Sequence, residues 1–110
     1  MEDPLTLFAL LCAGHALCDY PLQGDFLAKA KNRYAPMPGV PAWQALAAHS
    51  AIHGGMVGLV TGSLWLGLAE FAIHVWTDDA KCRGSITFGQ DQAIHIVCKA
   101  AWALTAWWLL

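Results

Sequence analysis

One stripe of polar residues constrains this chain more than any other feature. Glu70, His74 and Asp78 recur every four residues, a spacing that places them on one side of an α-helix, about 6 Å apart along its axis. The residues between them are Phe, Ala, Ile, Val, Trp and Thr. Carboxylate and imidazole groups in such apolar surroundings are costly unless they are paired, hydrogen-bonded or bound to a metal. The stripe therefore predicts partners elsewhere in the chain.

Polar pairs with the same spacing occur in the other apolar segments. All five histidines have a His, Asp or Glu four residues away. A single such histidine is most simply a hydrogen-bonded core residue, but the repeated pattern favours a shared site. The additional pairs are His15 with Asp19, His49 with His53, and Asp91 with His95.

The composition predicts an integral membrane protein. Hydrophobic residues make up 57% of the chain and charged residues only 13%, whereas about a quarter of a typical soluble domain is charged. The six tryptophans suit a membrane interface. The net charge of −2 gives no indication of nucleic-acid binding. The partner that we expect is therefore the lipid bilayer.

We predict a single all-α domain over residues 1–110, an integral membrane four-helix bundle with up-down-up-down topology. The first and third segments are somewhat short of the roughly twenty residues that span a bilayer. Residues 25–32 of the first connector are expected to form a short helix along the membrane surface, and Gly62 marks a tight turn. The predicted long helices cover about 4–20, 42–62, 63–80 and 91–110.

The basic residues predict the orientation of the bundle. Lys29, Lys31 and Arg33 lie in the first connector, and Lys81 and Arg83 lie in the third. The positive-inside rule places these connectors in the cytoplasm and both termini outside. The polar residues of all four helices then fall in one layer near the cytoplasmic face. This layer contains His15, Asp19, His49, His53, Glu70, His74, Asp78, Asp91 and His95.

The predicted layer has the chemistry of a metal site. Nine candidate ligands exceed the three or four needed for one catalytic zinc ion, and they suit two ions that share a carboxylate. Imidazole and carboxylate without thiolate suit zinc, manganese or iron. Some of the nine are expected to orient a ligating imidazole without touching the metal. The four cysteines form no C-x-x-C pair, and we interpret them as small apolar residues.

Two lysines extend the polar stripes. Lys81 continues the face of Asp78, either as a snorkelling residue at the interface or as part of the site. Lys99 lies deeper in its segment and requires a carboxylate partner or a wet cavity. Together with the basic first connector, these lysines predict an electropositive mouth that attracts an anionic, lipid-like substrate.

Four patterns, spread over nearly the whole chain, carry a resemblance to a known family. The patterns are His15-x-x-x-Asp19-Tyr20-x-x-Gln23, His49-x-x-x-His53, Glu70-x-x-x-His74-x-x-x-Asp78-x-x-Lys81 and Asp91-Gln92-x-x-His95. In these patterns the chain resembles the bacterial and phage membrane family called domain of unknown function 3307, which implies a multi-pass protein of the bacterial inner membrane. The layout is more loosely similar to that of small membrane-bound metal-dependent hydrolases, which implies hydrolysis.

The leading hypothesis is a membrane-embedded metal-dependent hydrolase. It would cleave a phosphate or ester bond of a membrane-accessible substrate at the cytoplasmic face, with water activated by the metal as nucleophile. Glu70 or Asp91 would act as general base. Lys81 or Lys99 would stabilise developing negative charge.

Three alternatives remain open. A di-iron oxidase is compatible with histidines four residues apart, although such enzymes generally contain more histidine. A metal-ion transporter would need a polar path through the membrane, and the outer halves of the helices lack titratable residues apart from Lys99. A structural, homo-oligomeric membrane protein of phage type would use the polar network to hold its helices together. The small-residue face of Gly54, Gly55 and Gly58 suits close packing within or between chains.

Overall fold

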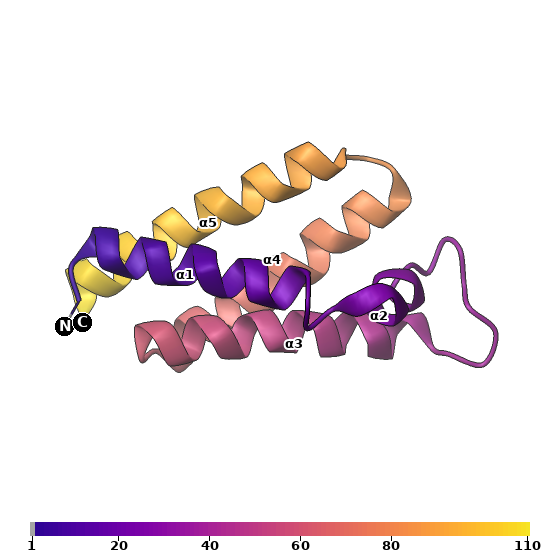
Figure 1. The fold of residues 1–110 in the computed structure, drawn as a ribbon, viewed down its shortest axis with the longest axis horizontal. Coiled ribbons are helices and arrows are strands. Elements are labelled where there is room, and N and C mark those ends of the chain that lie inside the picture. Colours follow the sequence, from indigo (N-terminus) through magenta and orange to yellow (C-terminus); the bar gives the residue numbers. More distant parts are fainter. Residues whose placement is uncertain (1) are drawn as a thin grey trace.

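The computed structural model describes residues 2–110, and this part of the chain is built from α-helices joined by turns and loops. The prediction of an all-α chain is confirmed. Four long helices alternate in direction, and a short helix follows the first of them (Figure 1). The helices are α1 (Pro4–Asp19), α2 (Gly24–Ala30), α3 (Ala42–Thr61), α4 (Leu64–Arg83) and α5 (Phe88–Leu109).

Local capping explains where the helices begin. The Asp3 side chain accepts a hydrogen bond of 2.8 Å from the backbone N–H of Thr6, and Pro4 occupies the first turn of α1. At the start of α5, the Thr87 hydroxyl accepts from the Gln90 N–H, and the Gln90 side chain accepts from the Thr87 N–H. This capping box starts α5 at Phe88, three residues before the predicted position.

Helices α3 and α4 form a tight hairpin. Gly62 ends α3 with φ of 73°, a left-handed conformation that favours glycine, and the Ser63 side chain caps α4. The two backbones pack directly against each other, because a Cβ atom on Gly54 would lie 2.7 Å from the carbonyl oxygen of Gly67. Two residues of the predicted small-residue face, Gly54 and Gly58, thus lie against a glycine of α4, whereas Gly55 meets nothing within 4 Å.

The molecule is elongated, with extents of 46 × 23 × 21 Å. Both termini lie at one end of the bundle, and α2 with its following loop lies at the other (Figure 1). The end of α1, the beginning of α3, the end of α4 and the beginning of α5 therefore share the α2 end. This arrangement brings all the predicted polar pairs into one half of the bundle.

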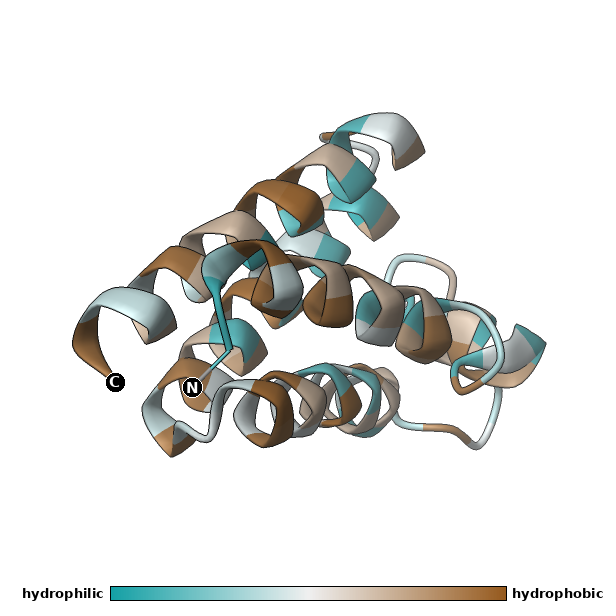
Figure 2. Cartoon of the chain, turned by 60° about the vertical axis from the view of Figure 1, so that its left-hand side comes forward, coloured by the Kyte–Doolittle hydropathy of each residue, from teal (hydrophilic) through white to brown (hydrophobic). Residues whose placement is uncertain are grey.

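The interior is divided between an apolar half and a polar half. Leu7, Leu11, Val57, Ala103 and Ala106 form a small apolar core towards the termini. The other half buries histidine, carboxylate and lysine side chains. Large apolar side chains instead lie on the outside, among them Leu59 at 87% exposure and Trp65 and Trp108 at 79%. Hydrophobic residues run along all the long helices, interrupted by polar ones (Figure 2).

Judged by length and apolar composition, no single helix within residues 2–110 is sufficient to cross a membrane. The pair α1 and α2 meets both criteria together, with a bend of 82° between the two helices.

The close contact between α3 and α4 predicts opposite effects of two neighbouring substitutions. Gly54→Ala should destabilise the protein, because overpacking against the Gly67 backbone typically costs about 1–3 kcal/mol. Gly55→Ala should be neutral or stabilising, because the added methyl group meets nothing within 4 Å and alanine is the better helix former. Thermal unfolding of both variants under identical conditions measures the difference. Equal melting temperatures would contradict the packing described for the hairpin.

Candidate metal centre

The structure brings all nine predicted polar residues into one continuous network. They come from four helices, and neighbouring members lie within hydrogen-bond or ion-pair distance of one another. Eight of them are buried, and Asp19 retains a side-chain exposure of 9%. Within the network, three groups hold their ligand atoms close enough together to bind a metal ion.

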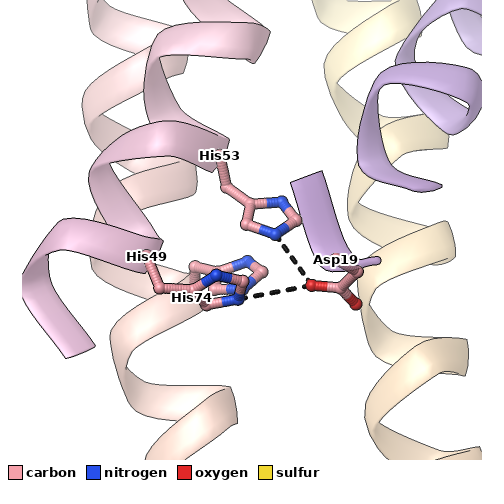
Figure 3. Close-up of side chains that lie close together, drawn as sticks. All are labelled: Asp19, His49, His53 and His74. Atoms are coloured by element: carbon pink, nitrogen blue, oxygen red, sulfur yellow. Dashed lines mark hydrogen bonds and ion pairs between the residues drawn. The ribbon is translucent and has the colours of Figure 1, made fainter. Parts of the chain in front are cut away.

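The first group combines three imidazoles with one carboxylate. His49 and His53 project from α3 and His74 from α4, towards Asp19 at the end of α1 (Figure 3). Asp19 Oδ1 lies 2.8 Å from His53 Nε2 and 3.3 Å from His49 Nε2. His49 Nε2 also lies 3.3 Å from His74 Nε2. Ligand atoms about 2.0–2.1 Å from a tetrahedral ion are separated by roughly 3.3 Å. The spacing of these atoms therefore suits an ion such as zinc, for which the stacked rings of His53 and His74, with centroids 3.7 Å apart, would turn to direct both lone pairs at it.

Glu70 determines the orientation of His74. Its Oε2 accepts a hydrogen bond of 2.9 Å from His74 Nδ1. A carboxylate only accepts, so this contact places the proton on Nδ1 and leaves the Nε2 lone pair directed at His49 and Asp78. The other oxygen, Oε1, accepts from Lys99 at 2.7 Å and from Trp102 at 3.0 Å. Glu70 thus has the position of the carboxylate that typically supports a metal-bound imidazole.

Lys99 has a carboxylate partner, as its position deep within an apolar segment predicts. Both members of the Lys99–Glu70 pair have fully buried side chains. The Trp102 N–H, which completes the hydrogen bonds of Glu70, is not anticipated by the sequence analysis. Lys99 and Trp102 lie three positions apart on α5, so helical periodicity could have placed both on the face that meets Glu70.

The second group consists of Asp78, Asp91 and His95. Asp78 connects it to the first group, because its Oδ2 lies 3.3 Å from His49 Nε2 and its Oδ1 lies 3.7 Å from His95 Nε2. His95 Nε2 and Asp91 Oδ1 are 3.2 Å apart. Neither atom has a hydrogen-bond partner within residues 2–110. Two buried atoms that can both offer a lone pair, held close together and neither of them in a hydrogen bond, suit coordination of a shared cation.

A third group, Glu70, His74 and His95, is less suited to an ion. Both Glu70 oxygens already accept hydrogen bonds. The rings of His74 and His95 are stacked with centroids 4.2 Å apart. The hydrogen bonds of Glu70 distinguish this group from the first one, because His53 and His74 of the first group are stacked as well, with centroids 3.7 Å apart.

His15 lies beside the centre and outside all three groups. Its Nε2 donates to the Gln92 side-chain oxygen at 3.0 Å, and Gln92 Nε2 donates to Asp19 Oδ2 at 2.9 Å. These contacts hold the Asp19 carboxylate so that its other oxygen faces His53. His15 therefore orients a candidate ligand.

Lys31 is the residue of the centre that sequence reasoning missed. It caps the C-terminus of α2, is only 3% exposed, and donates a hydrogen bond of 2.6 Å to Asp78 Oδ2 and another to Gln23. The sequence analysis places it at the mouth of the site. The available signal was the short helix itself, since Leu27, Ala30 and Lys31 share one helical face.

Charged residues outside the centre hold the loop after α2 against α4. Arg33 donates two hydrogen bonds of 3.0 Å to Asp79, and the Tyr34 hydroxyl donates a third. The hydrogen bonds to Asp79 raise the pKa of the Arg33 guanidinium. Asp79, in the last turns of α4, thus binds the loop through its carboxylate.

A pocket of about 260 Å³ gives access to the centre beside α2. Asp19 and Lys81 line it where it meets the buried network, and the aromatic rings of Tyr20 and Phe88 line it further out. Lys81 is 22% exposed and lies 3.4 Å from Asp91 Oδ2 and 3.7 Å from Asp78 Oδ1. The remaining lining residues are Gln23, Gly24, Asp25 and Ala28.

Comparisons of the chain with known protein families, curated proteins and solved structures found no match.

The buried Glu70–Lys99 pair predicts that loss of one partner strongly destabilises the protein and that loss of both partners restores much of the stability. Lys99→Met leaves the Glu70 carboxylate buried without its ammonium partner, which typically costs about 3–5 kcal/mol. The double variant Glu70→Gln/Lys99→Met removes both charges and should recover much of this loss. The free energy of unfolding of the wild type, both single variants and the double variant tests the coupling. Additive effects would contradict the pairing.

Proposed function

We propose that the protein is a membrane-embedded metal-dependent hydrolase. The observation that carries the proposal is the group of Asp19, His49, His53 and His74, whose ligand atoms all lie within 4.8 Å of one another. Asp78, Asp91 and His95 offer the place for a second ion, with Asp78 between the two. Imidazole and carboxylate ligands suit zinc, manganese or iron.

The distribution of side chains supports a location in the membrane. Apolar side chains cover the outside, whereas polar ones fill much of the inside. Exposed tryptophans lie at both ends of the bundle, with Trp65 and Trp108 at the end of the termini and Trp43 at the end of α2. Helices α3 and α4 each have 20 residues, a length of about 30 Å that equals the thickness of the hydrocarbon layer, although neither meets the apolar composition expected of a single span.

We further propose the bacterial inner membrane as the location, with both termini outside. The resemblance to the family called domain of unknown function 3307 supports the bacterial membrane. The basic residues of the two connectors at the α2 end support the orientation. In this orientation the pocket beside Lys81 opens towards the cytoplasmic interface, where phosphate-bearing lipid headgroups lie.

A divalent ion in the first group would supply Lewis acidity and a nucleophile derived from water at neutral pH. The hydrogen bonds disfavour Glu70 as the general base, because both of its oxygens accept hydrogen bonds, whereas Asp91 Oδ1 has no partner in the described chain and is free either to act as a base or to bind a second ion. Lys81 lies between this carboxylate and the pocket, where it can contact a negatively charged substrate. Lys99 is committed to Glu70 and supports His74.

A closed site fits the interior better than a transport path does. The half of the bundle nearest the termini is filled by the apolar core around Leu7, Leu11 and Val57. A transported ion would need polar groups through this half. The polar residues are instead concentrated in the half that carries the pocket.

Metal content tests the proposal directly. Protein purified in mild detergent without chelator should contain zinc, manganese or iron, measured by plasma mass spectrometry. His53→Ala removes one of the four donors and should weaken binding by more than about 100-fold, since loss even of a residue that only supports a ligand costs about 10–100-fold. His15→Ala removes only a residue that supports Asp19 and should weaken binding by about 10–100-fold, less than His53→Ala does.

Activity should follow the metal. The wild type should hydrolyse a phosphate or ester substrate in lipid–detergent micelles, chelation should abolish the reaction, and His53→Ala should be inactive while keeping its helical circular-dichroism spectrum. Unchanged metal affinity in His53→Ala would refute the assignment of the site.

A further inference from the structure

The buried network carries a nearly balanced set of charges. Its four carboxylates belong to Asp19, Glu70, Asp78 and Asp91, and each of three lysines lies against one or two of the last three. With neutral histidines, four carboxylates against three ammonium groups leave one negative charge. One divalent ion changes this to one positive charge, and a second ion would raise it to three. A net charge of three is strongly unfavourable in a poorly solvated interior.

The lysines differ in their freedom to move. Lys31 and Lys99 are buried and hold short contacts of 2.6 and 2.7 Å to Asp78 and Glu70. Lys81 is partly exposed and makes longer contacts of 3.4 and 3.7 Å to Asp91 and Asp78. Its ammonium group also lies 5.7 Å from the centroid of the Phe88 ring, on the side of the pocket. Lys81 is therefore the lysine best placed to leave the network.

Lys81 occupies the surroundings of the second group of donors. The carboxylates that it contacts, Asp78 and Asp91, are two of the three residues of that group. The third, His95, is fully buried, and its Nε2 has no hydrogen-bond partner within the described chain. A dication bound by these three residues would lie within a few ångströms of the ammonium group, where the repulsion between the two is strong.

We propose that Lys81 and a second metal ion exclude each other, and that an oxyanion in the pocket exchanges one for the other. This inference rests on the proposed function. Without substrate, the centre holds one ion in the first group, Lys81 balances the charge of Asp91, and Lys31 is paired with Asp78. A phosphate group in the pocket draws Lys81 towards itself, and its negative charge offsets the second ion, which then binds at Asp78, Asp91 and His95.

The pocket favours a small phosphate monoester as the substrate class. Its volume of about 260 Å³ suits one phosphate and part of the group attached to it. Lys81 is the cationic residue of its lining, beside the carboxylates of Asp19 and Asp25, so the attraction of a phosphate depends on the positive charge that the metal centre adds behind Asp19. Tyr20 and Phe88 offer apolar walls for the group attached to the phosphate.

The number of bound ions tests this coupling. Equilibrium dialysis against manganese, with and without inorganic phosphate, is followed by plasma mass spectrometry. The wild type should bind about one equivalent without phosphate and about two with it. Lys81→Met should bind about two equivalents even without phosphate. Lys81→Arg keeps the positive charge and should bind one, and Lys29→Met, which removes an exposed lysine of α2, should behave as the wild type does.

The outcomes separate this inference from the proposed function. Two ions in the phosphate-free wild type, or one ion in Lys81→Met, would overturn the exclusion while leaving the metal centre in place. A second ion in Lys81→Met, without a phosphate effect in the wild type, would support the exclusion and overturn the link to an oxyanion. No ion in any variant would overturn the metal centre itself. Circular dichroism of each variant verifies that the helices are retained.

Discussion

The structure depends on the burial of carboxylates in a helical interior. A buried carboxylate without a partner is far less stable than one in water, so each must be matched by a cation, a hydrogen-bond donor or a metal. Glu70 illustrates the requirement, since it accepts from His74, Lys99 and Trp102 on two helices. The same requirement explains why imidazoles and lysines face inwards here while leucine and tryptophan face outwards.

The short helix α2 is part of this solution. It follows α1 after a sharp bend and positions Lys31, whose ammonium group binds Asp78 beneath the bundle surface. Arg33 and Tyr34 then fix the following loop to Asp79, one residue further along α4. The connector is thereby attached to the two neighbouring carboxylates of α4 and covers one side of the centre. The pocket opens on the other side of α2, which leaves Asp19 and Lys81 accessible.

Much of this arrangement could be predicted from the sequence, because it depends on helical periodicity and on the order of the helices. Residues four apart lie on one face, and alternating helix directions bring four such faces to the same end. Periodicity and turn residues therefore predict all nine polar residues, the short helix of the first connector and the turn at Gly62. The helix ends at Arg83 and Phe88 differ from the prediction, because the glycine cap after α4 and the capping box of α5 determine them.

The distribution of roles within the nine residues could not be predicted. Whether Glu70 binds an ion or orients His74 depends on which side chains of α5 reach it. The role of His15 in orienting Asp19 likewise follows only from its contact with Gln92. Lys31 comes from a connector whose path periodicity alone does not determine. Gly67 has no marked pattern in the sequence, and its importance follows from the crossing point of α3 and α4.

The central claim is that three imidazoles and a carboxylate can hold one ion between α1, α3 and α4. X-ray absorption spectroscopy of the zinc-loaded protein tests it most directly. The account predicts nitrogen and oxygen neighbours at about 2.0–2.1 Å, with the multiple scattering typical of several imidazoles. A shell of sulfur at about 2.3 Å would assign the zinc to cysteines. That result, or oxygen neighbours without imidazole scattering, would contradict the proposed centre.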